Sequence, residues 1–395
     1  MNNTDGRLGA ITGKDYVLTV LAAFFFIAVN FIFLSLAPLY TVSQGHSDFL
    51  AGFQNTFFSV FCVVFRFYLG PMADRRGRKG MMLLGSSTFV AGPLVVWFSG
   101  GHYGLILAGR LLMAVGMAAF LSAVSCYIAE AVMPQHRGFA IGVQRAFYSV
   151  ALMIAPVAGL AVADSAAGFG GLFLLSAGLG VCAVLLVTGI QDRRVEGCET
   201  NHVHRDTAVI LRNPLNRRIY LSILTLCLSY GVLLSYITLY LGRFEAIPSP
   251  GAFFTVFAAS GLLGSVLAGM LSDRFSRQAI ARPALLGMGA GMGLLFLVPV
   301  SPVVAAVLSG LLTGTCFTGG VSVLVSWLVD ITPAHQRGTA LGIQESNIDA
   351  GIALGSLLFG TVTLGVSFPL AFLLIGALGV SVPLLTMSAK EVSNP

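Results

Sequence analysis

Long apolar runs separated by short polar breaks dominate the chain. Each run approaches or exceeds the ~20 residues that a helix needs to cross a bilayer, and Gly, Pro or charged residues bound it. Helices in soluble cores are shorter and are interrupted more often by charge. The pattern predicts twelve membrane-spanning helices, at residues 16–39, 49–72, 81–99, 103–129, 138–163, 170–190, 218–241, 251–272, 280–300, 302–328, 338–364 and 367–388.

The composition supports this all-α membrane class. Of the 395 residues, 56% are hydrophobic and 10% are charged, whereas a soluble domain carries roughly 25% charged residues. The first run has span length and no small-residue cleavage site before it, so we expect a retained helix rather than a signal peptide. The net charge of +6 comes from basic residues scattered among loops, which argues against a nucleic-acid partner.

The cysteines and histidines do not form a recognisable site. The six cysteines are scattered, five of them within apolar runs, which argues against disulfides and a metal centre. Cys198, His202 and His204 have metal-like side chains, but they lie in a polar linker that we expect to be solvated. We therefore expect no metal and no cofactor.

Lysine and arginine gather in the loops on one side of the predicted bundle. They concentrate in the loops after the second, fourth, eighth and tenth helices and in the central segment 191–217, and Arg243 is the exception on the other side. Positive residues mark cytoplasmic loops. We therefore expect both termini and the central segment in the cytoplasm.

The two halves of the chain repeat each other at a shift of about 200 residues. Gly70-x-x-x-Asp74-Arg75 returns as Gly269-x-x-x-Asp273-Arg274. The block from Glu130 to Gln144 returns as the block from Asp330 to Gln344. Such duplication is a known plan of transporters, with two halves related by an axis along the membrane normal. We expect a six-helix half at 1–190, a cytoplasmic linker at 191–217 and a second half at 218–395.

The loop after the second helix reads Gly70-Pro-Met-Ala-Asp-Arg-Arg-Gly77-Arg78-Lys-Gly80. It resembles the G-x-x-x-D-R-x-G-R-[KR] signature of the major facilitator superfamily, and together with the twelve spans and the repeat this resemblance covers nearly the whole chain. The second copy, which begins at Asp273, is degraded. The resemblance implies the major facilitator fold and transport of a small molecule by alternating access.

The resemblance also implies a cytoplasmic latch that holds the halves together when the cavity opens outward. Gly70 would allow a close helix approach, and Asp74 could pair with a nearby arginine or face a helix N-terminus. We expect Glu130 to pair with Arg78, and Asp330 with Arg274 or Arg277. The alternative is a basic loop that only sets topology. The predicted latch comprises Gly70, Asp74, Arg75, Gly77, Arg78, Glu130, Asp273, Arg274 and Asp330.

Few ionisable residues lie at membrane depth, where they are costly and usually functional. They are Arg66, Arg110, Arg145, Glu345 and Asp349. Arg110 lies in a segment that resembles the family's L-x-x-R-x-x-x-x-G motif, which implies a part in proton coupling; the alternative is an arginine that bonds helix carbonyls.

Glu345 and Asp349 are the acids that we expect to carry protons. They are four residues apart and so share a helix face. Arg66 lies eight residues before Asp74 and Glu345 eight residues after Arg337, so their expected depths match and a pair between Arg66 and either acid is predicted. Its alternative is a packing salt bridge with no part in transport. For Asp48, at the outer start of the second run, we expect a helix N-cap.

Candidate substrate contacts come from the helices that line the path in the family. We name Asn30, Tyr127, Tyr230 and Tyr236, together with Arg145 and Gln344 from the repeated blocks. Aromatic residues at helical spacing more often pack than bind. Asn30 is the clearer candidate, because an amide in mid-span needs a partner.

The expected function is secondary active transport, with proton-coupled efflux of a small organic molecule leading. Ala155-Pro156-Val-Ala-Gly159 is similar to the exporters' G-P-x-x-G-G motif, with Ala in place of the first Gly and Leu160 in place of the last. Three intramembrane arginines against two acids favour an anionic substrate, such as a metabolite, metallophore or drug. The alternatives are a proton symporter that imports a small acid and, more remotely, a membrane enzyme or receptor. We expect a monomer in a bacterial inner membrane, with protons and the lipid bilayer as its other partners.

Overall fold

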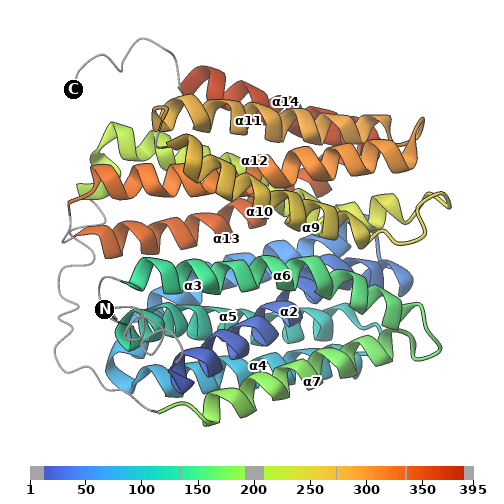
Figure 1. The fold of residues 1–395 in the computed structure, drawn as a ribbon. Coiled ribbons are helices and arrows are strands. Elements are labelled where there is room, and N and C mark those ends of the chain that lie inside the picture. Colours follow the sequence, from blue (N-terminus) through green and yellow to red (C-terminus); the bar gives the residue numbers. More distant parts are fainter. Residues whose placement is uncertain (1–12, 133–135, 192–208, 273, 334–335, 387–395) are drawn as a thin grey trace, which may run out of the picture. The chain divides into compact units, whose positions relative to one another are not determined.

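The computed structural model describes residues 13–132, 136–191, 209–272, 274–333 and 336–386, and its long elements are all helical (Figure 1). In chain order they are α2 (Lys14–Ser43), α3 (Asp48–Arg76), α4 (Arg78–Trp97), α5 (Tyr103–Ala131), α6 (Arg137–Ala163), α7 (Gly168–Thr188), α9 (Pro214–Leu241), α10 (Ala252–Ser272), α11 (Arg277–Leu294), the short 3₁₀ helix η3 (Leu295–Leu297), α12 (Pro302–Ile331), α13 (Arg337–Val362) and α14 (Phe368–Thr386).

Each predicted apolar run corresponds to one of these helices. Ten of them, from α2 to α12, are long and apolar enough to cross a membrane, among the described residues. The apolar part of α14 is shorter, at Phe368–Ser381. Helix α13 has full span length but is not among these ten, and its first half carries a polar stretch from Gln344 to Asp349. This polar stretch contains both predicted proton acceptors, Glu345 and Asp349.

The contacts divide the chain into two compact units. The first comprises Met1–Gly45 and Phe57–Glu199, and the second His46–Thr56 and Thr200–Pro395. Helix α3 is shared between them, since its first turns belong to the second unit and the remainder to the first. The sequence assigned the whole of α3 to the first half and gave no sign that its outer turns group with the second.

Within the first unit, α4 packs along α5 and α7, and α2 packs along α6 and α7. Within the second unit, α11 packs along α12 and α14, and α9 packs along α13, while α10 packs along α12. Three of these pairings correspond between the units: α4–α5 with α11–α12, α4–α7 with α11–α14, and α2–α6 with α9–α13. The repeat that the sequence shows in two short blocks extends to the packing of the helices inside each unit.

A matching hydrogen bond ties the equivalent helices of each unit. The Tyr16 hydroxyl of α2 donates to the Ala140 carbonyl of α6 at 3.1 Å. The Tyr220 hydroxyl of α9 donates to the Ala340 carbonyl of α13 at 3.0 Å. These carbonyls lie in the first turn of their helices, where the repeated Gly-x-x-x-Gly-[Val/Ile]-Gln block begins. The bond therefore fixes the start of α6 and of α13 against the neighbouring helix.

Glycines set the closeness of α13 to α9. A Cβ atom added at Gly355 would meet the carbonyl oxygen of Leu228, and one added at Gly351 would meet the Cβ atom of Cys227. Gly231, on α9, lies equally close to the backbone of Ile352. Gly351 and Gly355 form a small-xxx-small pair, the arrangement that lets membrane helices approach each other's backbone. This contact holds the polar half of α13 at a fixed register on α9.

Candidate functional site

The signature loop is a one-residue break between two helices. Helix α3 ends at Arg76 and α4 begins at Arg78, with Gly77 between them at φ 92° and ψ 147°. Only glycine adopts this region without strain, which explains the glycine of the motif. Arg78 is buried, with 7% of its side chain exposed. The side chains of Gly70, Asp74, Arg75 and Glu130, and the whole of Asp273, lie outside the described residues, so their part in the latch stays a prediction.

The corresponding loop of the second unit forms an ion pair. Arg277 Nε donates to Asp330 Oδ2 at 3.2 Å, which links the start of α11 to the end of α12. The sequence offered Arg274 or Arg277 as the partner of Asp330, and the structure has Arg277; Arg274 is exposed. Both side chains are partly solvated, and such pairs typically contribute ~1 kcal/mol or less.

Lys79, the next residue of the signature loop, has a contact that the sequence did not reveal. Its ammonium group donates to the carbonyl oxygens of Thr188 at 2.8 Å and Ile190 at 2.6 Å. These carbonyls end α7, and a cation is favourable at the C-terminus of a helix. The basic loop therefore also holds α4 against the end of α7 within the first unit.

Arg110 is enclosed by aromatic and sulfur-containing side chains of the first unit. It is fully buried, and its guanidinium carbon lies 4.2 Å from the ring centre of Phe58 and 5.9 Å from that of Phe33. Its Nη1 atom lies 4.0 Å from the sulfur of Met113. A cation stacked on aromatic faces away from water gains ~2 kcal/mol or more per contact, so the two rings offset part of the cost of burying this charge. The sequence predicted the buried arginine but not its aromatic surroundings.

The polar half of α13 gathers the acids of the second unit. Asp349 is 5% exposed and Glu345 is half-buried. Both carboxyl groups interact electrostatically with the buried thiol of Cys227, on α9. Between them along the helix, Asn347 donates from Nδ2 to the Tyr220 carbonyl at 2.8 Å. The structure thus places both predicted proton acceptors where α13 packs on α9.

The repeated glutamines differ in their partners. Gln144 donates from Nε2 to the Tyr148 hydroxyl at 2.6 Å, one turn further along α6. The residue at the equivalent place of α13 is Ile348, and Gln344 is fully buried with neither amide atom hydrogen-bonded to any described group. A buried amide without a partner costs free energy, so a polar ligand that supplies the missing bonds would be favoured there.

The three predicted tyrosine contacts divide into two situations. Tyr127 donates to the Gln191 carbonyl at 2.9 Å and Tyr236 to the Ser356 carbonyl at 3.1 Å, both in buried surroundings. Tyr230 stacks instead on Phe317 and Phe257, with ring centres 4.2 and 5.6 Å away. The structure gives Tyr127 and Tyr236 a role in tying segments together, whereas Tyr230 is a buried ring packed against two phenylalanines. A substrate contact from any of the three stays a prediction.

Asn30, on α2 of the first unit, is 3% exposed, and its Oδ1 atom accepts no hydrogen bond from any described residue. The predicted substrate contact of Asn30 stays a prediction, and this unused acceptor is compatible with it. Arg66 and Arg145 belong to the first unit, whereas Glu345 and Asp349 belong to the second. The pairing of Arg66 with either acid stays a prediction, as does a substrate contact from Arg145.

Residues 46–56 make contacts that the sequence did not reveal. We expected Asp48 to cap the helix, but the hydroxyl of Ser47 accepts the bond from the Leu50 amide in its place. The Asp48 carboxylate forms an ion pair with Arg243 at 2.7 Å. The Arg243 guanidinium also stacks on Phe368 at 4.2 Å. Arg243, the exception to the predicted distribution of basic residues among the loops, therefore has an acidic partner within the second unit.

Deeper along the same segment, the Asn55 amide donates to Ser235 at 3.0 Å, and Ser235 in turn bonds the hydroxyl of Ser356. The Thr56 hydroxyl donates to the Ala353 carbonyl at 3.2 Å. A buried polar chain therefore joins the outer part of α3 to α9 and α13.

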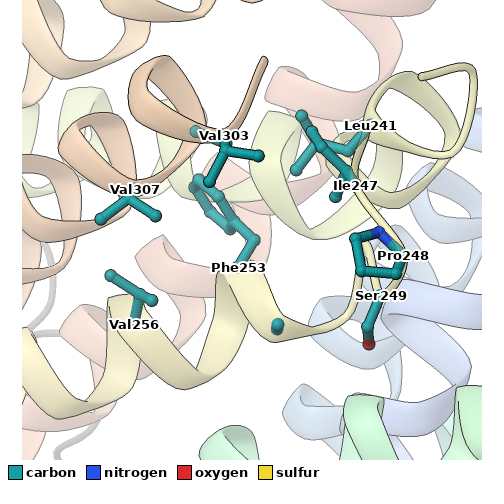
Figure 2. A pocket seen from close by; sticks show the side chains of 10 residues that line it. Leu241, Ile247, Pro248, Ser249, Phe253, Val256, Val303 and Val307 are labelled. Carbon is teal, nitrogen blue, oxygen red and sulfur yellow. The ribbon is translucent and has the colours of Figure 1, made fainter. Parts of the chain in front are cut away.

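Figure 2 shows an apolar cavity of about 180 Å³ in the second unit, where the loop after α9 meets α10 and α12. The labelled Phe253, Val256, Val303 and Val307 side chains converge on it, and Ser249 is a polar residue at its edge. It holds no charged side chain among its lining residues, so it offers packing rather than specific recognition. Among the described residues no group of three or more His, Cys, Asp or Glu could hold a metal ion.

A bundle of span-length apolar helices, with glycine-mediated packing and a few buried charged groups, defines a multi-pass helical membrane protein. The family model of the Major Facilitator Superfamily matches residues 19–248 and 246–394, and the chain belongs to this superfamily. The predicted family and fold class are thereby confirmed, and the chain is a transporter rather than an enzyme.

Curated relatives are distant but cover most of the chain. The inner membrane transport protein YajR of Escherichia coli K12 is 25% identical over 346 residues, covering 81% of this chain and 70% of the relative. The multidrug resistance protein MdtG of Escherichia coli O1:K1 / APEC is 24% identical over 375 residues, covering 91% and 90%.

Solved structures show the same fold at lower identity. The nucleoside transporter NupG matches with a TM-score of 0.77 at 13% identity, covering 95% of this chain and 98% of NupG. A D-xylose–proton symporter matches with a TM-score of 0.78 at 18% identity, covering 94% and 96%. These likenesses establish the architecture and leave the substrate to the residues of this chain.

Proposed function

We propose that this secondary transporter exports a small organic anion, a metabolite, metallophore or drug, in exchange for protons. The observation that carries the proposal is the polar half of α13, where buried Asp349 and half-buried Glu345 lie against α9. An exchanger needs a group that is charged in one state and neutral in another, and acids at membrane depth are the residues suited to that change.

The preference for an anion rests on the fixed positive charge of the first unit. Arg110 is completely buried among aromatic rings, and an arginine keeps its charge throughout a transport cycle. Arg66 and Arg145 add two more cations at the predicted membrane depth. Gln344, Asn30 and Tyr230 would supply uncharged contacts, since the two amides have unused bonding capacity.

Efflux is favoured over import by the relatives that carry the name multidrug resistance protein, which match across nearly the whole chain. The competing function is a symporter that brings in a small acid with a proton.

The location that fits either function is a bacterial inner membrane, which is where the name of the YajR relative places that protein. We propose that both termini and residues 191–217 lie in the cytoplasm. Reporter fusions at Glu199 and Pro395 should both report cytoplasm, and a periplasmic signal at either would contradict this orientation.

The latch is part of the proposal. Asp74, Arg75 and Arg78 with Glu130, and Asp273, Arg274 and Arg277 with Asp330, would hold the cytoplasmic ends together in one state of the cycle. Asp74→Asn should then reach the membrane in normal amount and transport slowly. Its absence from the membrane would show that Asp74 serves folding instead.

Everted membrane vesicles with an acidic lumen separate export from import. A panel of small fluorescent carboxylate dyes is added outside, and a lumenal pH probe is read together with dye accumulation. An exporter should accumulate a dye while the lumen loses protons, and vesicles with Asp349→Asn should do neither. Dye movement that acidifies the lumen would establish the symporter, and a panel of organic cations transported in place of the anions would refute the proposed substrate charge.

A further inference from the structure

A second cavity lies at the start of α9, away from the membrane-embedded acids. It is a shallow hollow of about 470 Å³ that is open to the surface, and its wall combines Arg217 and Arg218 with the leucines Leu211, Leu221 and Leu224 and with Asn347 of α13. All of these residues belong to the second unit. None of them has a role in the transport path that the sequence predicts.

The two arginines stand at an electrostatically unfavourable place. Helix α9 begins at Pro214, so Arg217 and Arg218 lie in its first turns, where the helix dipole is positive and cations are disfavoured. The first turn of α9 contains no acidic residue. Arg217 is exposed and forms no ion pair with any described residue. An anion in the cavity would therefore be favoured by Arg217 and by the positive end of α9.

The rest of the cavity wall is apolar and lies next to the arginines on the same face of α9. Residues 214, 217, 221 and 224 recur at intervals of three and four, which places them in one row. Leu221 is 42% exposed and Leu211 40% exposed. A cavity with a cationic end and an accessible apolar wall suits an amphiphile whose charged head and hydrocarbon chain occupy these two parts.

We propose that this cavity binds the phosphate group of an anionic phospholipid, with an acyl chain along Leu221 and Leu224. One arginine can donate two parallel N–H bonds to a phosphate group. Basic pockets between membrane helices are suited to lipid head groups. The site also touches α13, because Asn347 lines the cavity and bonds the α9 backbone at Tyr220. Lipid occupancy would therefore stabilise the contact that positions Glu345 and Asp349.

Thermal unfolding of the purified full-length protein in detergent tests the proposal. Phosphatidylglycerol should raise the unfolding temperature, and phosphatidylcholine with the same chains should raise it much less. The double variant Arg217→Gln/Arg218→Gln should weaken the phosphatidylglycerol response about thirtyfold in concentration, since each basic residue contributes ~1 kcal/mol toward an anionic lipid. Arg212→Gln/Arg282→Gln removes the same charge outside the cavity and should leave the response unchanged.

Conservative variants and soluble probes complete the test. Arg217→Lys/Arg218→Lys keeps both charges and should retain most of the response, which guards against a misfolded glutamine variant. Leu221→Gln should weaken the response to phosphatidylglycerol but not to glycerol 3-phosphate. The proposal fails if glycerol 3-phosphate or inorganic phosphate stabilises the protein as well as the lipid does, if phosphatidylcholine is equally effective, or if the glutamine double variant responds like the parent.

Discussion

Helices α6 and α13 hold the same place in their two units and differ in what their polar residues do. Both are bound at their first turn by a tyrosine hydroxyl from the neighbouring helix, and both carry the repeated Gly-[Val/Ile]-Gln. On α6 the glutamine is satisfied by Tyr148. On α13 Gln344 has no such partner, and two acids follow it.

This difference shows how a duplicated scaffold can be divided between support and chemistry. Within α6 the repeated glutamine is paired along its own helix, so it needs no outside partner. Within α13 the amide is unsatisfied and an acid is buried, an arrangement that costs stability and is retained where a site requires it. The predictions that follow test whether α13 is the working member of the pair.

The largest effect should come from separating α13 from α9. A leucine at Gly355 would collide with the Leu228 carbonyl, and backbone clashes of this kind cost about 3 kcal/mol or more. Gly355→Leu should therefore be nearly absent from the membrane in quantitative immunoblots. Gly342→Leu is the matched control on the same helix, because a Cβ there meets nothing within 4 Å. Equal loss of both variants would show that α13 tolerates no leucine rather than that Gly355 sets the contact.

Replacing the buried arginine of the first unit should come next. Arg110→Ala removes a charge stacked on Phe58, and we expect transport to fall at least tenfold, since intramembrane charges of this kind serve function. Arg110→Lys keeps the charge without the planar stacking group and should recover part of the rate. Initial rates of dye transport, normalised to protein in the membrane, measure both. Full activity of Arg110→Ala at normal abundance would assign the arginine no part in transport.

A moderate effect should follow when α13 is made to resemble α6. Ile348→Tyr would offer Gln344 the phenol that Gln144 has, one turn away. If Gln344 contacts the substrate, the apparent affinity should fall by up to about tenfold, the worth of one hydrogen bond. Ile348→Phe supplies the same bulk without a hydroxyl and should retain more affinity. A shared loss in both variants would point to crowding instead of hydrogen bonding.

The sequence predicted most of this fold because membrane helices are encoded by long apolar runs that depend little on tertiary context. It also located the acids of α13, since charge is rare at membrane depth. The partners of polar groups were harder to predict. The contacts of Asp48 with Arg243 and of Lys79 with the end of α7 join segments far apart in sequence, and only packing brings them together. For the same reason, the sequence did not show that Tyr127 and Tyr236 bond to backbone carbonyls whereas Tyr230 stacks on phenylalanines.

The smallest effect should come from the ion pair at the start of α3. Arg243 is 49% exposed and Asp48 33% exposed, so their coupling should be about 1 kcal/mol or less and should weaken in high salt. A double-mutant cycle with Asp48→Asn and Arg243→Gln, read by thermal unfolding at low and high salt, measures it. Coupling that is larger and independent of salt would mean that this pair is shielded from solvent.

The central claim is that the acids of α13 couple transport to protons, and purified protein in liposomes tests it most directly. Accumulation driven by an imposed pH gradient and exchange without a gradient are measured side by side for Glu345→Gln, Asp349→Asn and their combination. Glu245→Gln, which neutralises an exposed acid outside the helices, is the control and should match the parent in both assays. We predict that the α13 variants lose accumulation and keep exchange. Accumulation against a gradient by the combined variant would contradict the account and place coupling elsewhere in the protein.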